Sequence, residues 1–428
     1  MTPDEGGVAP RQMALLALPA VLLGAFAAVM LWALEQLADL LGGVLWETIP
    51  DALGVDPSGW WIVLILTLTG LAVGLGLQFL PGHGGPDSAT TELIEPPLKL
   101  RVLPGLAVVT VLSLAGGVSL GPENPIIAIN IAIIVSLFAR LMPKVPVQVA
   151  VMIGAAATVG ALFGTPVAAA LLFTGIVAAV KGGGSLWDKL FLPVAAAGAG
   201  ALTMHLLGAP PLSFGTLPEY GSPQAIDALT GMLVACAAVG LSLVALYLFP
   251  ILWRALHALK HPILIPLAGG FILGILGLIG GPITMFKGLT QIGELLQDPG
   301  AYDGTQLAMI AGIKILALLV AASALFRGGR IFPATFIGVA LGMLGAVLIP
   351  GMPLGLAVAC GIAGVVLVVG RDGWLAIFLG VAVPNDITLL PMLCLIVLPA
   401  WLLVSRMPLF RIVAPAPSPR SPADSVTA

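Results

Sequence analysis

One carboxylate stands where an apolar stretch of this chain begins. The segment Ser119-Leu120-Gly121-Pro122-Glu123-Asn124-Pro125 is followed by the apolar residues 126–129. A Gly-Pro pair ends a preceding helix, and the first four amides of the next helix lack partners within it. Such a helix start favours negative charge and binds anions. An acid among lipid-compatible residues is costly, so such a residue usually has a function. Glu123 is therefore a candidate for chemistry with anions.

The two protonation states of Glu123 are favoured by opposite surroundings. Helix amides stabilise the carboxylate, whereas burial among apolar residues stabilises the neutral acid. A free anion would compete with the carboxylate for the same electropositive position. The alternative is a glutamate that only caps a helix at an aqueous edge.

The composition indicates a polytopic membrane protein. Of 428 residues, 59% are hydrophobic and 9% are charged, and the mean hydropathy is +1.13. Soluble domains have about 25% charged residues. The 17 basic and 20 acidic residues nearly balance, which argues against a nucleic-acid partner. Cys236, Cys360 and Cys394 are too scattered for a disulfide framework or a metal cluster, and we interpret them as packing residues.

Apolar runs follow one another with short interruptions. A membrane-spanning helix needs about 20 residues, and several runs are shorter and bounded by Gly or Pro. Broken helices are tolerated where they are buried in protein or line a cavity, and they point to an ion or substrate site near the middle of the membrane. The predicted runs are 14–41, 60–80, 102–120, 126–141, 147–162, 167–180, 190–207, 225–250, 263–279, 307–326, 332–349, 354–369, 374–383 and 387–404.

A polar, proline-rich stretch at 209–224 divides the chain. An offset of 207 residues pairs Gly121 with Gly328 and Gly154 with Gly361. Because the chain has 54 glycines, chance also produces such pairs, and the inverted repeat of a transporter stays a hypothesis here. The expected parts are a cytoplasmic lead-in at 1–13, a first membrane half at 14–208, the linker, a second membrane half at 225–413 and a disordered tail at 414–428.

Four motifs, in order, resemble those of CLC-type anion channels and transporters, and the match runs over about residues 60–410. Residues 82–86 (Gly-His-Gly-Gly-Pro) resemble Gly-Ser-Gly-Ile-Pro, and residues 121–125 resemble Gly-Arg/Lys-Glu-Gly-Pro. Residues 329–333 (Gly-Arg-Ile-Phe-Pro) resemble Gly-x-Phe-x-Pro, and residues 407–410 resemble the start of the last helix, where the family usually has a tyrosine. The resemblance implies an all-α membrane protein of CLC architecture, with two inverted halves of tilted and broken helices. It also implies a homodimer with one pathway in each subunit.

The resemblance assigns roles to individual residues. Glu123 would be the gate, whose carboxylate occupies an anion position when ionised and swings away when protonated or displaced. His83, in place of serine, either donates a hydrogen bond to the anion or lines an inner vestibule. Phe410, in place of tyrosine, removes a hydroxyl donor, so we expect backbone amides to dominate the site. The expected site is ringed by three helix starts, at residues 83–86, 123–125 and 330–333. Its expected anion-binding residues are His83, Gly84, Gly121, Asn124, Arg330, Ile331, Phe332 and Phe410.

Proton-coupled members usually have a second, internal glutamate. Residues 163–166 (Phe-Gly-Thr-Pro) resemble the family's Phe-Asn-Ala-Pro, and counting on from them places that glutamate at Gly175 or Ile176. No carboxylate occurs between Pro166 and Asp188. The expected cargo is chloride or another small monovalent anion, with channel-like conduction favoured and an exchanger selective for fluoride or nitrate as an alternative. No cofactor, metal or nucleotide is expected, since the tail is too short for regulatory nucleotide-binding domains.

The other charged residues give a topology. Lys314 either raises the inner potential or snorkels to an interface, and Arg330 either attracts anions or pairs with an acid. The basic loop at 254–261 favours a cytoplasmic location by the positive-inside rule. We therefore expect a multi-pass protein of the inner membrane, surrounded by lipid, with both termini in the cytoplasm.

Two other classes of function fit parts of the sequence. Residues 117–121 match the Gly-x-Ser-x-Gly pattern of a nucleophile elbow, so an intramembrane serine hydrolase would use Ser119 with a base such as His205. The turn before Glu123 accounts for the same glycines, and we do not expect an enzyme. A secondary transporter of organic anions or of a cation would need more side-chain donors or oxygen ligands than these motifs supply.

Overall fold

The computed structural model describes residues 10–179, 185–209, 212, 214 and 217–413. The predicted tail at 414–428 and residues 1–9 of the predicted lead-in lie outside this part of the chain. Residues 10–13 belong to the first helix, so that helix begins before the predicted residue 14. The helices are α1 (Pro10–Gly43), α2 (Ile49–Leu53), α3 (Trp60–Phe79), α4 (Leu103–Ala115), α5 (Glu123–Leu141), α6 (Val147–Phe163), α7 (Pro166–Ala179), α8 (Leu186–Leu206), α9 (Ala225–His257), α10 (Leu264–Gly280), α11 (Leu289–Gln297), α12 (Gly304–Ser323), α13 (Ile331–Leu348), α14 (Leu354–Gly370), α15 (Gly373–Ala382) and α16 (Leu390–Val404).

Helices account for the whole architecture of the described residues, which contain no sheet. Eight helical stretches in this part of the chain are long and apolar enough to span a membrane. Others, such as α6, α10 and α14, are apolar but have only 10–17 residues. The prediction of an all-α membrane protein with short, broken helices is confirmed.

One predicted run is wrong and one helix was missed. The run at 102–120 does not form one helix, because α4 ends at Ala115. A side chain at Gly116 would come within 2.1 Å of Thr69 Oγ1, and Gly117 has a φ of +87°, which L side chains rarely adopt. The chain therefore leaves the helix and runs non-helically to Glu123. The short amphipathic helix α11 was not predicted, because its length and polar residues resemble a loop.

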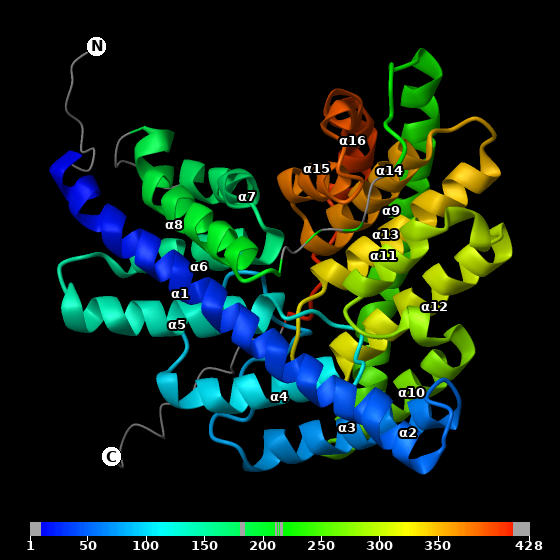
Figure 1. The fold of residues 1–428 in the computed structure, drawn as a ribbon, viewed down its shortest axis with the longest axis horizontal. Coiled ribbons are helices and arrows are strands. Elements are labelled where there is room, and N and C mark those ends of the chain that lie inside the picture. Colours follow the sequence, from blue (N-terminus) through cyan, green and yellow to red (C-terminus); the bar gives the residue numbers. More distant parts are fainter. Residues whose placement is uncertain (1–9, 180–184, 210–211, 213, 215–216, 414–428) are drawn as a thin grey trace, which may run out of the picture.

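The packing of helices in the first half recurs in the second half. In the first half, α1 packs against α4, α5, α6 and α8, and in the second half α9 packs against α12, α13, α14 and α16. Likewise, α5 with α6, α6 with α7, α6 with α8 and α7 with α8 correspond to α13 with α14, α14 with α15, α14 with α16 and α15 with α16. Figure 1 shows α5–α8 grouped on one side and α12–α16 on the other, with α1 crossing the first group. This recurrence supports the proposed division of the chain near residues 209–224.

The extensive contacts between the halves join equivalent elements. Helix α3 packs against α10, and α7 packs against α15. A two-fold relation between halves produces such contacts, because only equivalent elements meet at the axis. The starts of α5 and α13 also meet there, and their first residues are Glu123 and Ile331. The structure therefore pairs Gly121 with Gly329, not with Gly328 as the sequence offset suggested.

Candidate functional site

The turns before α5 and α13 join the two halves of the molecule. Gly121 and Gly329 make an isolated antiparallel bridge. The Gly121 N–H donates to the Gly329 carbonyl at 2.9 Å, and the Gly329 N–H donates to the Gly121 carbonyl at 2.6 Å. The N-termini of two helices, one from each half, are thereby fixed side by side. Both helix starts place free amides and positive dipole ends at this position.

The Glu123 carboxylate already occupies this electropositive position. Its Oε1 accepts a hydrogen bond from the backbone N–H of Phe332 at 2.7 Å, in the first turn of α13. The residue is fully buried, and Oε2 has no hydrogen-bond partner. A side-chain carbon on Gly121 or Gly329 would lie 2.2 or 2.1 Å from Oε2. Glycine at both positions therefore leaves the space that the carboxylate fills.

The predicted helix start at residues 82–86 is absent. Gly82, His83, Gly84 and Gly85 all have positive φ, between +51° and +77°, which a right-handed helix cannot contain. No helix follows until residue 100. The His83 ring is exposed, and its Nδ1 lies 3.0 Å from the carbonyl of Leu77. Anion binding by His83 and Gly84 stays a prediction, but the helix dipole expected there does not exist.

The turn at residues 82–86 binds an arginine instead. The buried Arg327 donates from Nε to the Gly84 carbonyl at 3.0 Å and from Nη2 to the His83 carbonyl at 3.3 Å. Its Nη1 donates to Leu325 O at 2.8 Å and lies 3.8 Å from Asp87 Oδ1. The carbonyls of the first motif therefore hold the segment that leads into α13.

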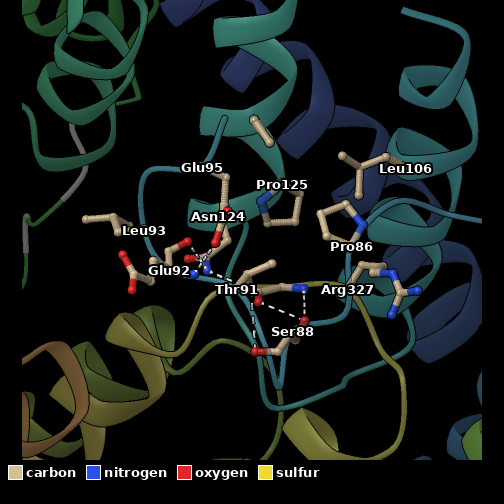
Figure 2. Close-up of a pocket in the computed structure, with 12 residues that line it drawn as sticks. Pro86, Ser88, Thr91, Glu92, Leu93, Glu95, Leu106, Asn124, Pro125 and Arg327 are labelled. Carbon is tan, nitrogen blue, oxygen red and sulfur yellow. Dashed lines mark hydrogen bonds between the residues drawn. The ribbon is translucent and has the colours of Figure 1, made fainter. Parts of the chain in front are cut away.

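Ser88 is a positioning residue that the motifs did not reveal. Its hydroxyl lies 2.7 Å from the Phe326 carbonyl and 3.0 Å from the Gly328 carbonyl, and it accepts the Gly328 N–H at 2.9 Å. Figure 2 shows it beside Arg327 in a small cavity of about 20 Å³, which is room for about one water molecule. The Asn124 side chain borders the same cavity and donates to Glu92 O at 3.1 Å and to Thr91 Oγ1 at 3.3 Å. The only sequence signal for Ser88 was that it belongs to a polar segment in an otherwise apolar chain.

A second cavity, of about 500 Å³, collects several of the predicted residues. Asn124, Arg330, Ile331 and Phe410 line it, and so does Ile176, the position where an internal glutamate was sought. Three arginines and two acids also border it, which gives it one more basic than acidic side chain. The charged lining residues are Arg330, Arg371, Arg411, Glu92 and Asp372.

Arg330 connects this cavity to the chain segment after α16. It is buried, and its guanidinium donates to the carbonyls of Phe410 and Thr91. The guanidinium carbon lies 5.7 Å from the centre of the Phe410 ring, a cation–π contact. Phe410 stacks on Phe249 with ring centroids 5.0 Å apart. Arg330 therefore uses carbonyls and a ring as partners, and no carboxylate within the described part of the chain is bonded to its positive charge at the cavity.

Lys314 is buried in α12 and does not snorkel to an interface. Its Nζ donates to the carbonyls of Thr284, Met285 and Phe286 at 3.1, 2.7 and 2.7 Å. It also lies 5.1 Å from the centre of the Phe336 ring. The lysine therefore supplies hydrogen-bond donors to three backbone carbonyls of a turn, which no helix hydrogen bond satisfies.

The arrangement around Ser119 gives the serine hydrolase no support. The Ser119 hydroxyl is buried and has no hydrogen-bond partner. His205 lies exposed in the last turn of α8. A nucleophile needs a base within hydrogen-bond reach, and that contact is missing here.

The chain is similar to known proteins over most of its length. The family model described as "Voltage gated chloride channel" matches residues 68–405. A protein of Escherichia fergusonii and one of Escherichia coli strain K12 (DH10B), both described as "Putative ion-transport protein YfeO", are 46% and 45% identical to it over 419 residues, which is 97% of this chain and 99% of each relative.

Solved structures share the fold at lower identity. A CLC-type fluoride/proton antiporter superposes with a TM-score of 0.75 at 19% identity, covering 93% of this chain and 97% of that one. A slow cyanobacterial Cl⁻/H⁺ antiporter gives a TM-score of 0.76 at 18% identity, covering 94% and 96%. The family model spans more than three quarters of the chain, and the paired helix starts lie within the matched range. The chain therefore belongs to the voltage gated chloride channel family.

Proposed function

We propose that this protein carries small monovalent inorganic anions, chloride first among them, across the membrane and that Glu123 gates the pathway. Membership of the voltage gated chloride channel family supports anion transport by a CLC-type pathway. The observation that carries the gating role is the hydrogen bond from the Phe332 amide to Glu123 Oε1. A negatively charged oxygen already sits at a helix N-terminus, so a diffusing anion and the carboxylate compete for one position.

The pathway continues from Glu123 into the 500 Å³ cavity. Asn124, next to the gate, and Arg330, next to the start of α13, both line that cavity. Arg330 brings positive charge that no carboxylate neutralises by direct contact, which raises the local concentration of anions. Phe410 lies under the Arg330 guanidinium and narrows the route without offering a hydroxyl donor. Phe410 and Arg330 therefore form the floor of the pathway on this side.

The lining of the cavity supports conduction that is not coupled to protons, because the position expected for an internal glutamate holds no proton acceptor. Ile176 lines the cavity and cannot carry a proton. We infer channel-like conduction, and an exchanger of fluoride or nitrate against protons is the other outcome of the same assay. We also infer a homodimer in the inner membrane with both termini in the cytoplasm, since the basic loop at 254–261 favours that side.

The test is Glu123→Gln, with Glu123→Ala beside it. Efflux of chloride, nitrate and fluoride from proteoliposomes would be followed by light scattering across a pH series, with and without a pH gradient. In the wild type we expect flux to rise as the pH falls, because the protonated side chain no longer competes with the anion. In each variant the flux should be independent of pH, because neither side chain can ionise.

The exposed Glu219→Gln serves as the matched control and should keep the wild-type profile. Identical pH profiles in the wild type and Glu123→Gln would remove the gating role. If an anion gradient drives proton movement, the protein is an exchanger and channel-like conduction is refuted.

A further inference from the structure

A partly buried ion pair lies beside the turns that hold Glu123, outside the cavity that Arg330 lines. Lys287 forms an ion pair with Glu35, and their side chains are only 25% and 21% exposed. Glu35 belongs to α1, in the middle of the long apolar stretch Met13–Leu53. A carboxylate at that depth is costly unless it has a partner and a use. Neither residue lines either of the two cavities described above.

Backbone contacts place Lys287 between the two turns that hold the gate. The N–H of Phe286 donates to the Gly117 carbonyl at 3.0 Å, in the segment that leads to Glu123. On the other side, a side-chain carbon on Gly288 would lie 2.9 Å from Cβ of Phe336, one helical turn beyond the amide that binds the carboxylate. Lys287 therefore stands between the start of α5 and the first turns of α13.

Helix α1 completes this enclosure. The indole of Trp46, just beyond α1, donates to the Ala115 carbonyl at 2.9 Å. Its ring meets the Phe286 ring edge-on, with centroids 5.6 Å apart. The Glu35 carboxylate reaches Lys287 from the same helix. The ion pair is thus fixed from three elements and is not a loose surface contact.

The charges of both residues lie near the gate. Lys287 follows Phe286, whose amide binds the Gly117 carbonyl ahead of Glu123, so the opposite charges of Lys287 and Glu35 act on the carboxylate with opposite sign. The segment from Gly116 to Pro122, which precedes the gate, carries no charged side chain. Two other cations lie nearby, and both are occupied by carbonyls: the Nζ of Lys314 binds three of them, and the Arg330 guanidinium binds those of Phe410 and Thr91. Lys287 is therefore the cation whose effect on the gate is offset by a paired acid, Glu35.

We propose that the Glu35–Lys287 ion pair sets the pH at which Glu123 opens, with Lys287 favouring the ionised gate and Glu35 opposing it. The pair therefore tunes and positions the gate without contacting the anion. The inference rests on the proposed gating by Glu123. Asp39, one turn along α1, also faces the pair, and Arg330, just before the start of α13, also faces Glu123.

The sign of each effect follows from charge alone. Removing Lys287 takes away a cation that stabilises the carboxylate, so Glu123 becomes protonated at higher pH. Removing the charge of Glu35 takes away an anion that destabilises the carboxylate, so protonation moves to lower pH. A unit charge at a partly buried site shifts such a midpoint by about one pH unit.

The experiment measures the pH of half-maximal chloride flux in proteoliposomes. Lys287→Gln should move this midpoint to higher pH and Glu35→Gln should move it to lower pH, each by about one pH unit. Lys287→Arg should keep the wild-type midpoint, and the double variant Glu35→Gln/Lys287→Gln should return near it. The exposed Lys260→Gln is the matched control.

Shifts in the same direction, or none, would overturn the proposal, because a purely structural tie between α1 and the 285–288 segment predicts no opposed signs. If Lys287→Gln does not fold, Glu35→Gln and Lys287→Arg still decide the question. A wild type whose flux is independent of pH and of Glu123→Gln would instead refute the gating function itself. The two failures are therefore distinguishable.

Discussion

Glu123 occupies the position that we propose for a diffusing anion, and it is held there by only one of its two oxygens. Oε1 accepts the Phe332 amide, while Oε2 is buried without a partner. An unsatisfied buried polar atom costs about 1–3 kcal/mol. The gating that we propose needs such a balance: one hydrogen bond holds the carboxylate in place, and the unpartnered oxygen lowers the cost of leaving when it is protonated or displaced.

Gly329→Ala is expected to push the carboxylate out of its position. The added carbon would lie 2.1 Å from Oε2 and 2.6 Å from Cδ of Glu123, and a side chain yields more readily than the bridged backbone. Flux at neutral pH should therefore rise toward the level that the wild type reaches at low pH. Gly312→Ala, where nothing lies within 4 Å, is the control in the same flux assay. A lower flux with an unchanged pH profile would contradict this account.

His83→Ser is expected to shift the order of preference among chloride, nitrate and fluoride. The change replaces an imidazole by a smaller hydroxyl donor on the turn whose carbonyls hold Arg327. Competitive flux measurements would give the order, with the exposed His261→Ser as control. An unchanged order would assign His83 to the lining of a vestibule, in keeping with its contact to the Leu77 carbonyl.

At the scale of elements, the gate depends on turns that no regular helix supports. The segment 284–286 leaves three carbonyls outside any helix ladder, and the Nζ of Lys314 satisfies all three. This holds α12 against the turn, which in turn bonds to Gly117 through the Phe286 amide. A buried lysine is retained here because its hydrogen bonds compensate for desolvation of the charge.

Lys314→Met is predicted to destabilise the protein by about 3 kcal/mol or more, because it leaves three buried carbonyls unpaired. The melting temperature in detergent should fall by several degrees. Lys99→Met, which changes an exposed side chain, is expected to leave the melting temperature unchanged. Equal melting temperatures for Lys314→Met and the wild type would show that the carbonyls find other partners.

At the scale of the whole molecule, the site exists because two similarly packed halves meet at equivalent elements. The recurring contacts of α1 and α9, and the pairing of α3 with α10 and of α7 with α15, bring two helix N-termini to one place. Each half alone would supply one helix dipole and one turn. Together they produce a position where the amide of one half binds the carboxylate of the other.

A homodimer with one complete site per subunit should show independent gates. In a tandem fusion that joins one wild-type copy to one Glu123→Gln copy, we expect the flux at each pH to be the mean of the two parent proteins. Light scattering of the purified protein in detergent should give the mass of two chains. A flux that follows either parent alone would show that the two pathways are coupled.

The helical architecture could be predicted because each spanning segment is specified locally by apolar residues of sufficient length. The turn at Glu123 was also predictable, since Gly121 and Pro122 act on the backbone directly. The prediction of a helix start at residues 82–86 was wrong, also for a local reason: four consecutive residues there have positive φ angles, which a helix cannot contain. Its motif resembled a helix start, but the structure uses its carbonyls to hold Arg327.

The sequence by itself determined the class of protein, the positions of most helices and the acid that we propose as the gate. These follow from hydropathy, from glycine and proline, and from one acid placed at a helix start. Only the tertiary structure decided what surrounds that acid. Phe332 binds it from α13, while Ser88, Arg327 and Lys287 fix the turns around it through contacts between distant parts of the chain. Such contacts depend on how the two halves pack, and no local pattern encodes a partner some 200 residues away.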